Sequence, residues 1–330
     1  MAALLFAPAA ANDSTAELAT GGLILKKTDS IEMRSEDLFI STEEVRVSYR
    51  FLNTSGSDVT TVVAFPMPDI GGEGFFNSDV GIPDMAAPAN ILDFRTTVDG
   101  KAVKAEVEQK AMVGTVDHSA WLKARKIPLA PQLDATTRAL DGLSAADKAE
   151  AKRLGLVIVD EYDAGKGWES HLAPVWVLKT TFYWTQTFPA GREVRIDHRY
   201  KPSVGGSVDT IVGTEMWDKN TEGWAADMKR RHCIEPSFAA GVAKRRAGAA
   251  YSGFQEQRVS YVLKTGANWA KPIGEFRLVI DKGAADNLVS FCASGVKKIS
   301  PTQFEVRKTN FTPTDDLHIL ILVPHRPVAD

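Results

Sequence analysis

The stretch VRVSYRFLNTSGSDVTTVVAFPMPD, from Val45 to Asp69, carries the clearest β-strand pattern in the chain. Apolar side chains alternate with polar ones from Val45 to Phe51 and again from Val59 to Phe65. This period of two predicts half-buried strands, because successive side chains of a strand point to opposite faces of a sheet. The polar gap NTSGSD between the two runs is typical of a turn. We therefore predict a β-hairpin that forms part of the wall of a β-sandwich.

Two prolines end this stretch and open a long loop. Pro66 and Pro68 lack an amide donor, so a strand ladder must stop or become an edge there. The following residues, 69–90, are rich in Gly, Pro and Asp. We predict that three carboxylates of this loop contact a ligand or partner at the rim of the sandwich, and these are Asp69, Asp79 and Asp84. Their spacing is not that of an EF-hand, so we assign no metal, and a merely solvated loop is the alternative.

The rest of the chain shows strand patterns that two helical segments interrupt. The 330 residues exceed what one typical core needs, so we expect two domains. Helix-forming sequence with capping residues occupies about 117–155, and a second helical segment follows the glycine pair at 205–206. Five further strands are predicted at 256–265, 273–281, 287–293, 303–309 and 317–323.

These patterns predict a mainly β protein with two β-sandwich-like domains. The first, 12–205, contains the short helical insertion, and the second, 206–330, opens with the helical segment. Residues 1–11 belong to neither domain.

The first residues resemble the end of a secretory signal peptide. MAALLFAPAAANDS contains a short apolar segment, and Ala9 and Ala11 fit an A-x-A cleavage site. The usual positive region is missing, so 1–11 would be a truncated signal remnant and the mature chain would begin at Asn12. A disordered Ala-rich tail is the alternative. Export would place the protein in the periplasm.

Two cysteines and the charge balance narrow the class further. Cys233 and Cys292 predict a disulfide if the chain is exported, with two separate buried thiols as the alternative. The formal net charge of −3 argues against a nucleic-acid-binding protein, which is normally basic. The mature chain contains no run of about 18 apolar residues, so we predict no transmembrane segment.

Several motifs resemble known families. The stretch 40–111, with FPMP and the DG turn, resembles the start of the vault and inter-alpha-trypsin domain. The segments LATGGLILKKTDSIEMRSEDLFIS, VAFPMPDI, LKTTFYWTQTFPAGREVRIDHRYKPSVGGS and NWAKPIGEFRLVIDKGAADNLVSFC resemble the bacterial exported family known as domain of unknown function 4424. The second resemblance spans nearly the whole mature chain. It implies export and a β-rich fold, and it supplies no catalytic residues.

Catalytic motifs are weak in this sequence. There is no G-x-S-x-G elbow, and the six histidines are not spaced as metal ligands on a helix or strand. His198 lies on the apolar face of a predicted strand and could act as a general base. A lone histidine on such a face is more often a hydrogen-bonded core residue. We predict no catalytic residue, no metal and no cofactor.

Tryptophans supply the remaining candidate residues. Trp217, Trp224 and Trp269 lie in irregular sequence with polar residues nearby, where indole faces could bind a sugar or another apolar-faced ligand. Packing between domains is the alternative, because aromatic side chains dominate such contacts.

We conclude from the sequence that this is an exported, non-catalytic binding or interaction protein of the bacterial cell envelope. It would recognise a protein or envelope component through rim loops or an interdomain cleft. One alternative is an envelope hydrolase that uses His198 and a loop carboxylate. A second is a periplasmic carrier of an apolar ligand between the two sandwiches.

Overall fold

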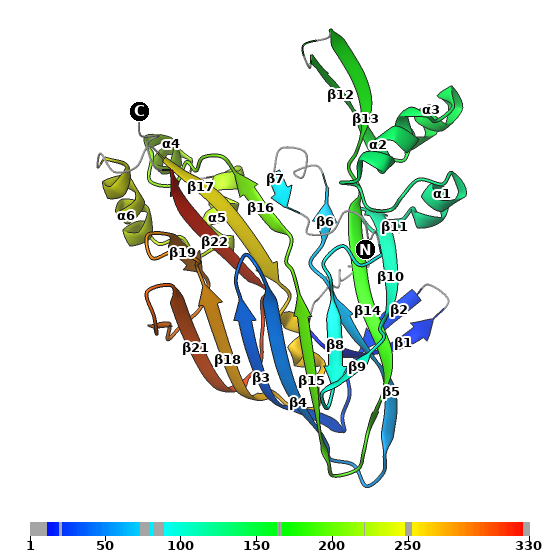
Figure 1. Ribbon diagram of the computed structural model, residues 1–330, viewed down its shortest axis with the longest axis vertical. Helices are drawn as coiled ribbons and strands as arrows, with labels where there is room; N and C mark the ends of the chain where they lie inside the picture. The colour runs from blue at the N-terminus through cyan, green and yellow to red at the C-terminus, as the bar shows by residue number, and fades with distance from the viewer. Residues whose placement is uncertain are drawn as a thin grey trace, which may run out of the picture.

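The computed structural model describes residues 12–19, 22–72, 79–81, 89–163, 165, 167–220, 222–247 and 253–325. The protein is mainly β, with several sheets and few helices (Figure 1). The strands are β1 (Ser14–Ala19), β2 (Gly22–Lys26), β3 (Ile31–Ile40), β4 (Val45–Asn53), β5 (Val59–Pro66), β6 (Ile70–Gly71), β7 (Asp79–Gly81), β8 (Arg95–Val98), β9 (Lys101–Val103), β10 (Glu106–Val113), β11 (Val116–Asp117), β12 (Val157–Asp163), β13 (Trp168–Pro174), β14 (Val177–Phe188), β15 (Glu193–Tyr200), β16 (Val204–Ser207), β17 (Gly253–Tyr261), β18 (Ile273–Asp281), β19 (Leu288–Phe291), β20 (Lys297–Lys298), β21 (Gln303–Phe311) and β22 (Leu317–His325). The helices are α1 (Ser119–Ala124), α2 (Asp134–Asp141), α3 (Ala145–Arg153), α4 (Glu215–Lys219), α5 (Gly223–Arg231), α6 (Pro236–Arg246) and the 3-10 helix η2 (Lys264–Asn268).

Three larger sheets and one two-stranded hairpin organise these strands. The eight-stranded sheet has the order β20-β21-β18-β3-β4-β15-β8-β9. The seven-stranded sheet has the order β11-β10-β14-β5-β1-β2, with β6 added beside β14, and the five-stranded sheet has the order β19-β22-β17-β16-β7. The hairpin β12–β13 projects away from the larger sheets beside α2 (Figure 1).

The predicted hairpin between 45 and 65 is wrong, although both of its strands exist. β4 pairs with β3 and β15 in the eight-stranded sheet, whereas β5 pairs with β1 and β14 in the seven-stranded sheet. The polar turn therefore carries the chain from one sheet to the other. The connection from β14 to β15 crosses between the same two sheets, and both turns lie at the lower end of the molecule in Figure 1.

Asn53 joins these two crossing turns. Its side-chain amide donates to the carbonyl oxygens of Ser57 and Phe188 at 2.8 Å each, and its Oδ1 accepts from the Ser55 amide. Its own carbonyl accepts from the amide of Gly191 at 3.0 Å. Buried at 0% exposure, Asn53 satisfies turn groups that would otherwise lack partners.

The DG turn behaves as the sequence predicts. β8 and β9 pair around Asp99 and Gly100, whose φ angles are 48° and 77°. Positive φ at both central residues is the signature of a type I′ turn, whose twist suits a two-residue hairpin.

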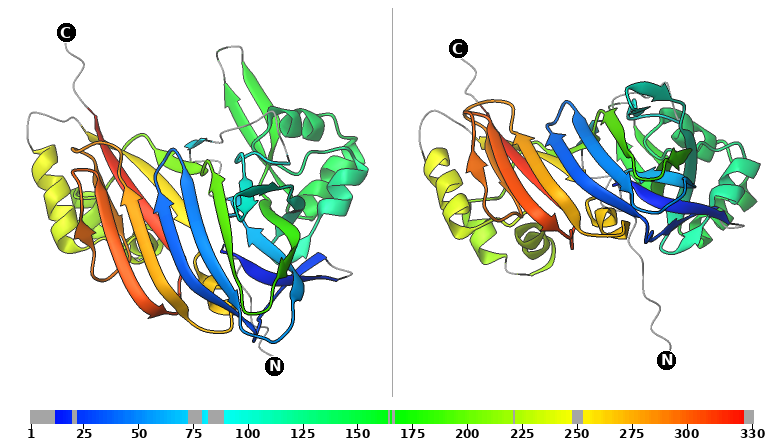
Figure 2. Two further views of the ribbon diagram at one scale, coloured as in Figure 1. Left: turned by 60° about the horizontal axis from the view of Figure 1, so that its bottom comes forward. Right: turned by 90° about the horizontal axis from the view of Figure 1, so that it is seen from below.

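One continuous core joins the two predicted domains. Tyr49 of the eight-stranded sheet, Phe65 of the seven-stranded sheet and Tyr261 of the five-stranded sheet belong to the same buried cluster. β18 pairs in parallel with β3, so strands from before and after residue 205 share the eight-stranded sheet (Figure 2). The predicted boundary at 205–206 lies within β16, and the division into two domains stays a prediction.

The two helical segments form where the sequence predicts them. α1, α2 and α3 lie within 117–155, and the Ser144 hydroxyl caps α3 by accepting from the amide of Asp147. The second segment forms α4, α5 and α6, which enclose a smaller buried cluster with Phe254, Leu320 and Leu322 of the five-stranded sheet.

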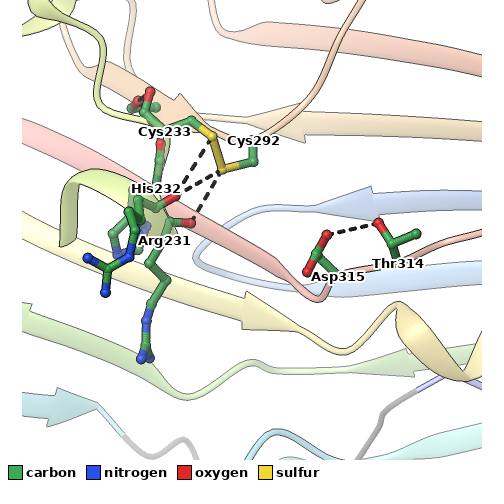
Figure 3. The surroundings of a disulfide bond; sticks show 8 residues. Arg231, His232, Cys233, Cys292, Thr314 and Asp315 are labelled. Atoms are coloured by element: carbon green, nitrogen blue, oxygen red, sulfur yellow. Dashed lines mark hydrogen bonds between the residues drawn. A yellow bond between two sulfur atoms is a disulfide. The ribbon is translucent and has the colours of Figure 1, made fainter. Parts of the chain in front are cut away.

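The predicted disulfide is confirmed. Cys233 and Cys292 are bonded with an S–S distance of 2.08 Å, and they join the end of α5 to the residue after β19 (Figure 3). The bond ties the helical cluster to the edge strand of the five-stranded sheet.

Removing this bond is expected to destabilise the protein. The cysteines are 59 residues apart, and closing a loop of that size typically contributes about 2–4 kcal/mol to the free energy of unfolding. Urea unfolding of the Cys233→Ser, Cys292→Ser variant should show this loss, and a reducing agent should lower the wild-type midpoint but not that of the variant. Equal midpoints for wild type and variant would contradict the expectation.

Candidate functional site

A pocket of about 230 Å³ lies where the loop after Pro66 meets the five-stranded sheet and the end of α5. We call it the junction pocket. Its lining residues are Pro68, Asp69, Ile70, Gly71, Ser203, Gly205, Arg231, His232, Arg258, Ser260 and His318. Most of these residues are polar, and they come from segments far apart in the sequence.

The proline loop is held in place by the seven-stranded sheet. The amide of Met67 donates to the carbonyl of Thr180, and β6 pairs with the start of β14. Gly71 has a φ of 107°, and a Cβ there would lie 2.5 Å from the Trp176 carbonyl oxygen, so only glycine fits. Asp69 is thereby fixed at the pocket wall, where Lys179 Nζ lies 2.6 Å from its carboxylate.

Two histidines also line the pocket. His232 follows α5 directly and is buried, and this burial together with His318 lowers its pKa to about 4. Burial and the Arg231 charge also lower the pKa of His318. Both rings are therefore neutral at pH 7, and a neutral imidazole offers one donor and one acceptor. His318 Nδ1 lies 2.9 Å from the Ser260 hydroxyl on the neighbouring strand.

Two arginines complete the pocket. Arg258 Nη1 lies 2.8 Å from the buried Glu256 carboxylate, and its Nη2 donates to the carbonyl of Gly206. Arg231 pairs with Asp227 at 3.1 Å. The pocket thus presents fixed cations, neutral imidazoles and one carboxylate, which suits a polar ligand with negative and hydrogen-bonding groups.

Of the three predicted acidic site residues, Asp69 is fully described, Asp79 only by its backbone, and Asp84 not at all. Asp69 lies in the junction pocket and is exposed. The backbone of Asp79 begins β7 and pairs with Gly206 in β16, but its side chain is outside the described part, as is the whole of Asp84. Their roles in binding stay predictions.

The three tryptophans are not brought together. Trp217 is buried in the helical cluster, and Trp269 is buried in the main core, where its Nε1 donates to the carbonyl of Asp13 at 2.8 Å. Trp224 is 57% exposed on α5. Among these three, only Trp224 presents an indole face to solvent.

His198 does not line an accessible catalytic site. Its side chain has no exposed surface, and its Nε2 lies 3.0 Å from Asp13 Oδ1. The rings of Phe65, Phe94 and Trp184 lie within 5.5 Å of the imidazole, centroid to centroid. An enclosed imidazole cannot reach a substrate, so the hydrolase hypothesis loses the base it proposed.

The apolar-carrier alternative receives no support from the packing between sheets. Phe51 and Trp269 have ring centroids 4.4 Å apart, as do Phe94 and Phe182. Aromatic side chains in such contacts fill the space that an apolar ligand would need.

Sequence reasoning missed Ser260, His232 and His318. Ser260 and His318 are 58 residues apart and meet only because β17 and β22 pair. The one available signal was a histidine inside the otherwise apolar run LHILILV.

The described residues contain no cluster of three or more His, Cys, Asp or Glu side chains arranged to hold a metal ion. Among the helices that the structure describes, none has the length and apolar character needed to cross a bilayer.

Comparison with known proteins gives one extensive match. Residues 11–320 match the model of the family described as "Domain of unknown function (DUF4424)". No curated protein matches the chain. A solved structure titled as a "putative nutrient binding protein" from Legionella pneumophila subsp. pneumophila str. Philadelphia 1 is similar at 17% identity, covering 96% of this chain and 70% of that one, with a TM-score of 0.43. The vault and inter-alpha-trypsin resemblance stays a prediction.

Proposed function

The chain belongs to the DUF4424 family, and we propose that it is an exported, periplasmic binding protein of the bacterial cell envelope that works without catalysis. The junction pocket recognises a protein or envelope component that carries negative and hydrogen-bonding groups. One observation carries this proposal: Asp69, two neutral histidines and two arginines converge on one pocket from distant parts of the chain.

The chemistry of the pocket favours recognition over turnover. Ser260 and His318 are within hydrogen-bonding distance, which is the first requirement for a nucleophile and its base. A catalytic base also needs a third group that orients it. Among the described residues, the histidines that form an ion pair with a carboxylate are His171 and His198, so neither His232 nor His318 has such an orienting group.

Export is supported by two independent features. The A-x-A pattern at Ala9 and Ala11 fits a cleavage site before Asn12. The Cys233–Cys292 disulfide is the kind of bond that persists in an oxidising compartment.

The proposal predicts a ligand retained by the native protein. Native mass spectrometry of protein purified from its own cells should show an additional bound mass. In the Asp69→Ala, Arg231→Ala variant, occupancy should fall about tenfold or more, because two charge-assisted hydrogen bonds are lost. A photo-crosslinker at Ser203 should form an adduct with the same species.

Matched controls make this test specific. Glu161→Ala removes a carboxylate on the distant β12–β13 hairpin and should leave occupancy unchanged. A crosslinker at Ser57, in the turn between β4 and β5, should form no adduct. If the bound mass is absent, or persists equally in the Asp69→Ala, Arg231→Ala variant, the junction pocket is not the binding site.

A further inference from the structure

The outward face of the eight-stranded sheet carries a regular array of arginines. It spans six adjacent strands, β21, β18, β3, β4, β15 and β8, which lie side by side in Figure 1. We call the array the arginine face, and it consists of Arg46, Arg50, Arg95, Arg195, Arg199, Arg277 and Arg307. These side chains alternate along their strands with buried ones, so they point to solvent.

The strand register places arginines directly opposite one another. The cross-strand pairs are Arg46 with Arg199, Arg50 with Arg195, Arg95 with Arg199, and Arg277 with Arg307. Like charges directly opposite on neighbouring strands destabilise a sheet. Four such pairs do not contribute to stability. Residue choices that disfavour the local structure are often found at functional sites, so these pairs indicate a functional surface.

Carboxylates offset only part of this charge. Glu305 is shared by Arg277 at 2.8 Å and Arg307 at 2.9 Å, and these two bonds lower its pKa to about 2. Glu44 is likewise shared by Arg46 and Arg199. The exposed guanidinium of Arg50 has no hydrogen-bond or ion-pair partner among the described residues.

Two adjoining hollows follow this face. Their volumes are about 680 Å³ and 600 Å³, and both are lined by Asp37, Ser48, Arg195 and Arg277, so they form one continuous groove. The cations that line the groove are Arg46, Arg50, Arg95, Arg195, Arg199, Arg277, Arg307 and Lys308. The carboxylates beside them are fewer: Asp37, Asp197 and Glu275 line the groove, and Glu44, Asp93 and Glu305 pair with its arginines. This excess of cations gives the groove a positive potential on a protein of net charge −3.

The shape of the groove indicates an extended ligand. Neighbouring strands are about 4.8 Å apart, so the arginines, carried by five of these six strands, extend across about 24 Å. Guanidinium groups bind phosphate oxygens through two parallel hydrogen bonds, which a lysine cannot do. Of the aromatic residues lining the two hollows, Phe276 and His198 are buried, and the Arg46 guanidinium covers the ring of Phe39 at 4.4 Å. The groove therefore lacks the free aromatic platforms on which nucleic-acid bases stack.

We propose that the arginine face binds a linear polyanion that carries phosphate groups and no bases, laid across the strands. This site is separate from the junction pocket, and its residues come from other strands. Arg50 and Arg195 form the centre of the site, because Arg50 is unpaired and Arg195 lines both hollows.

Binding of inorganic polyphosphate to the full chain tests this proposal. Titration calorimetry should show saturable binding that weakens as salt concentration rises, because ordered counterions are released. Arg50→Gln with Arg195→Gln should raise the Kd about tenfold or more, since charge-assisted hydrogen bonds are lost. Arg153→Gln with Arg230→Gln changes the net charge equally on exposed helices and should raise the Kd less than about twofold.

Each contrary outcome overturns the proposal. If polyphosphate does not bind detectably at low salt, the arginine face is not a polyanion-binding site. An equal loss in both double variants shows that only net charge matters. A single-stranded DNA of equal charge that binds as tightly contradicts a base-free ligand, and inorganic phosphate that binds as tightly contradicts an extended one. The Asp69→Ala, Arg231→Ala variant should bind polyphosphate normally, so failure here and failure of the junction pocket are distinguishable.

Discussion

Replacing Asp13 with alanine is expected to lower the free energy of unfolding by about 3–5 kcal/mol, the range for breaking a buried charged pair. Asp13 and His198 have no exposed side-chain surface, and their closest atoms are 3.0 Å apart. Burial raises the pKa of Asp13, while the charge and hydrogen bond of His198 oppose that rise. Without Asp13, the imidazole would be left among aromatic rings with neither nitrogen hydrogen-bonded to a side chain.

A double-mutant cycle measures how much of this loss belongs to the pair. Urea unfolding of Asp13→Ala, His198→Phe and the double variant should show that the double variant loses much less than the sum of the two single losses. Removing both partners leaves neither group of this pair buried without the other. Strictly additive losses would mean that the pair contributes no coupling. Glu161→Ala, on the exposed hairpin, should change stability by less than about 0.5 kcal/mol.

Stability is expected to fall as the pH rises from about 5 to 8 because of Glu36. Burial raises the pKa of this carboxyl from 4.5 to about 8. Between these values the unfolded chain has lost the proton and the folded protein still holds it, so the folded state binds more protons and each rise in pH favours unfolding. At about 1.4 kcal/mol per pH unit, the interval corresponds to roughly 4–5 kcal/mol. The raised pKa of Asp13 acts in the same direction.

Glu36→Gln should remove most of this dependence. The glutamine keeps an oxygen that can accept from the Asn12 side-chain amide, which lies 3.1 Å from the Glu36 carboxylate. Free energies of unfolding measured in urea at pH 5, 6.5 and 8 should decline for wild type and stay nearly level for the variant. Glu275→Gln, at the outward groove of the same sheet, should behave as wild type. A wild-type protein whose stability does not fall over this range would contradict the buried, protonated state of Glu36.

Individual strands were predictable because alternation is local, but their partners were not. The run from Val45 to Phe65 has the same pattern whether its two arms pair with each other or face each other across a core. The choice depends on β3, β14 and β15, which are supplied by other parts of the chain. Polar turn residues suit a hairpin and a crossing between two sheets equally well, so the predicted hairpin was wrong.

The burial of Glu36 was partly readable. Apolar positions in β3 are odd-numbered at Ile31 and Met33 and even-numbered at Leu38 and Ile40, which indicates a shift of register between them. The structure has a β-bulge between Met33 and Ser35, and this bulge turns Glu36 inward. No local pattern places Asn12, Asp13 or Tyr261 around it, because those contacts join distant segments.

The candidate site was predictable only where it is continuous in sequence. The prolines that end β5 identified Asp69, and the structure places it in the junction pocket. Ser260 and His318 escaped detection because their meeting depends on a strand pairing across 58 residues.

The parallel pairing of β3 with β18 also constrains how the chain folds as it is made. Arg277 and Asp37, which form an ion pair across these strands, are 240 residues apart in sequence. Ribosomes add about 5–20 residues per second, so β18 is synthesised roughly 12–48 s after β3. Until then its edge is unpaired and able to join a strand of another chain. This edge of β3 therefore stays unpaired until nearly all of the sequence is available for folding.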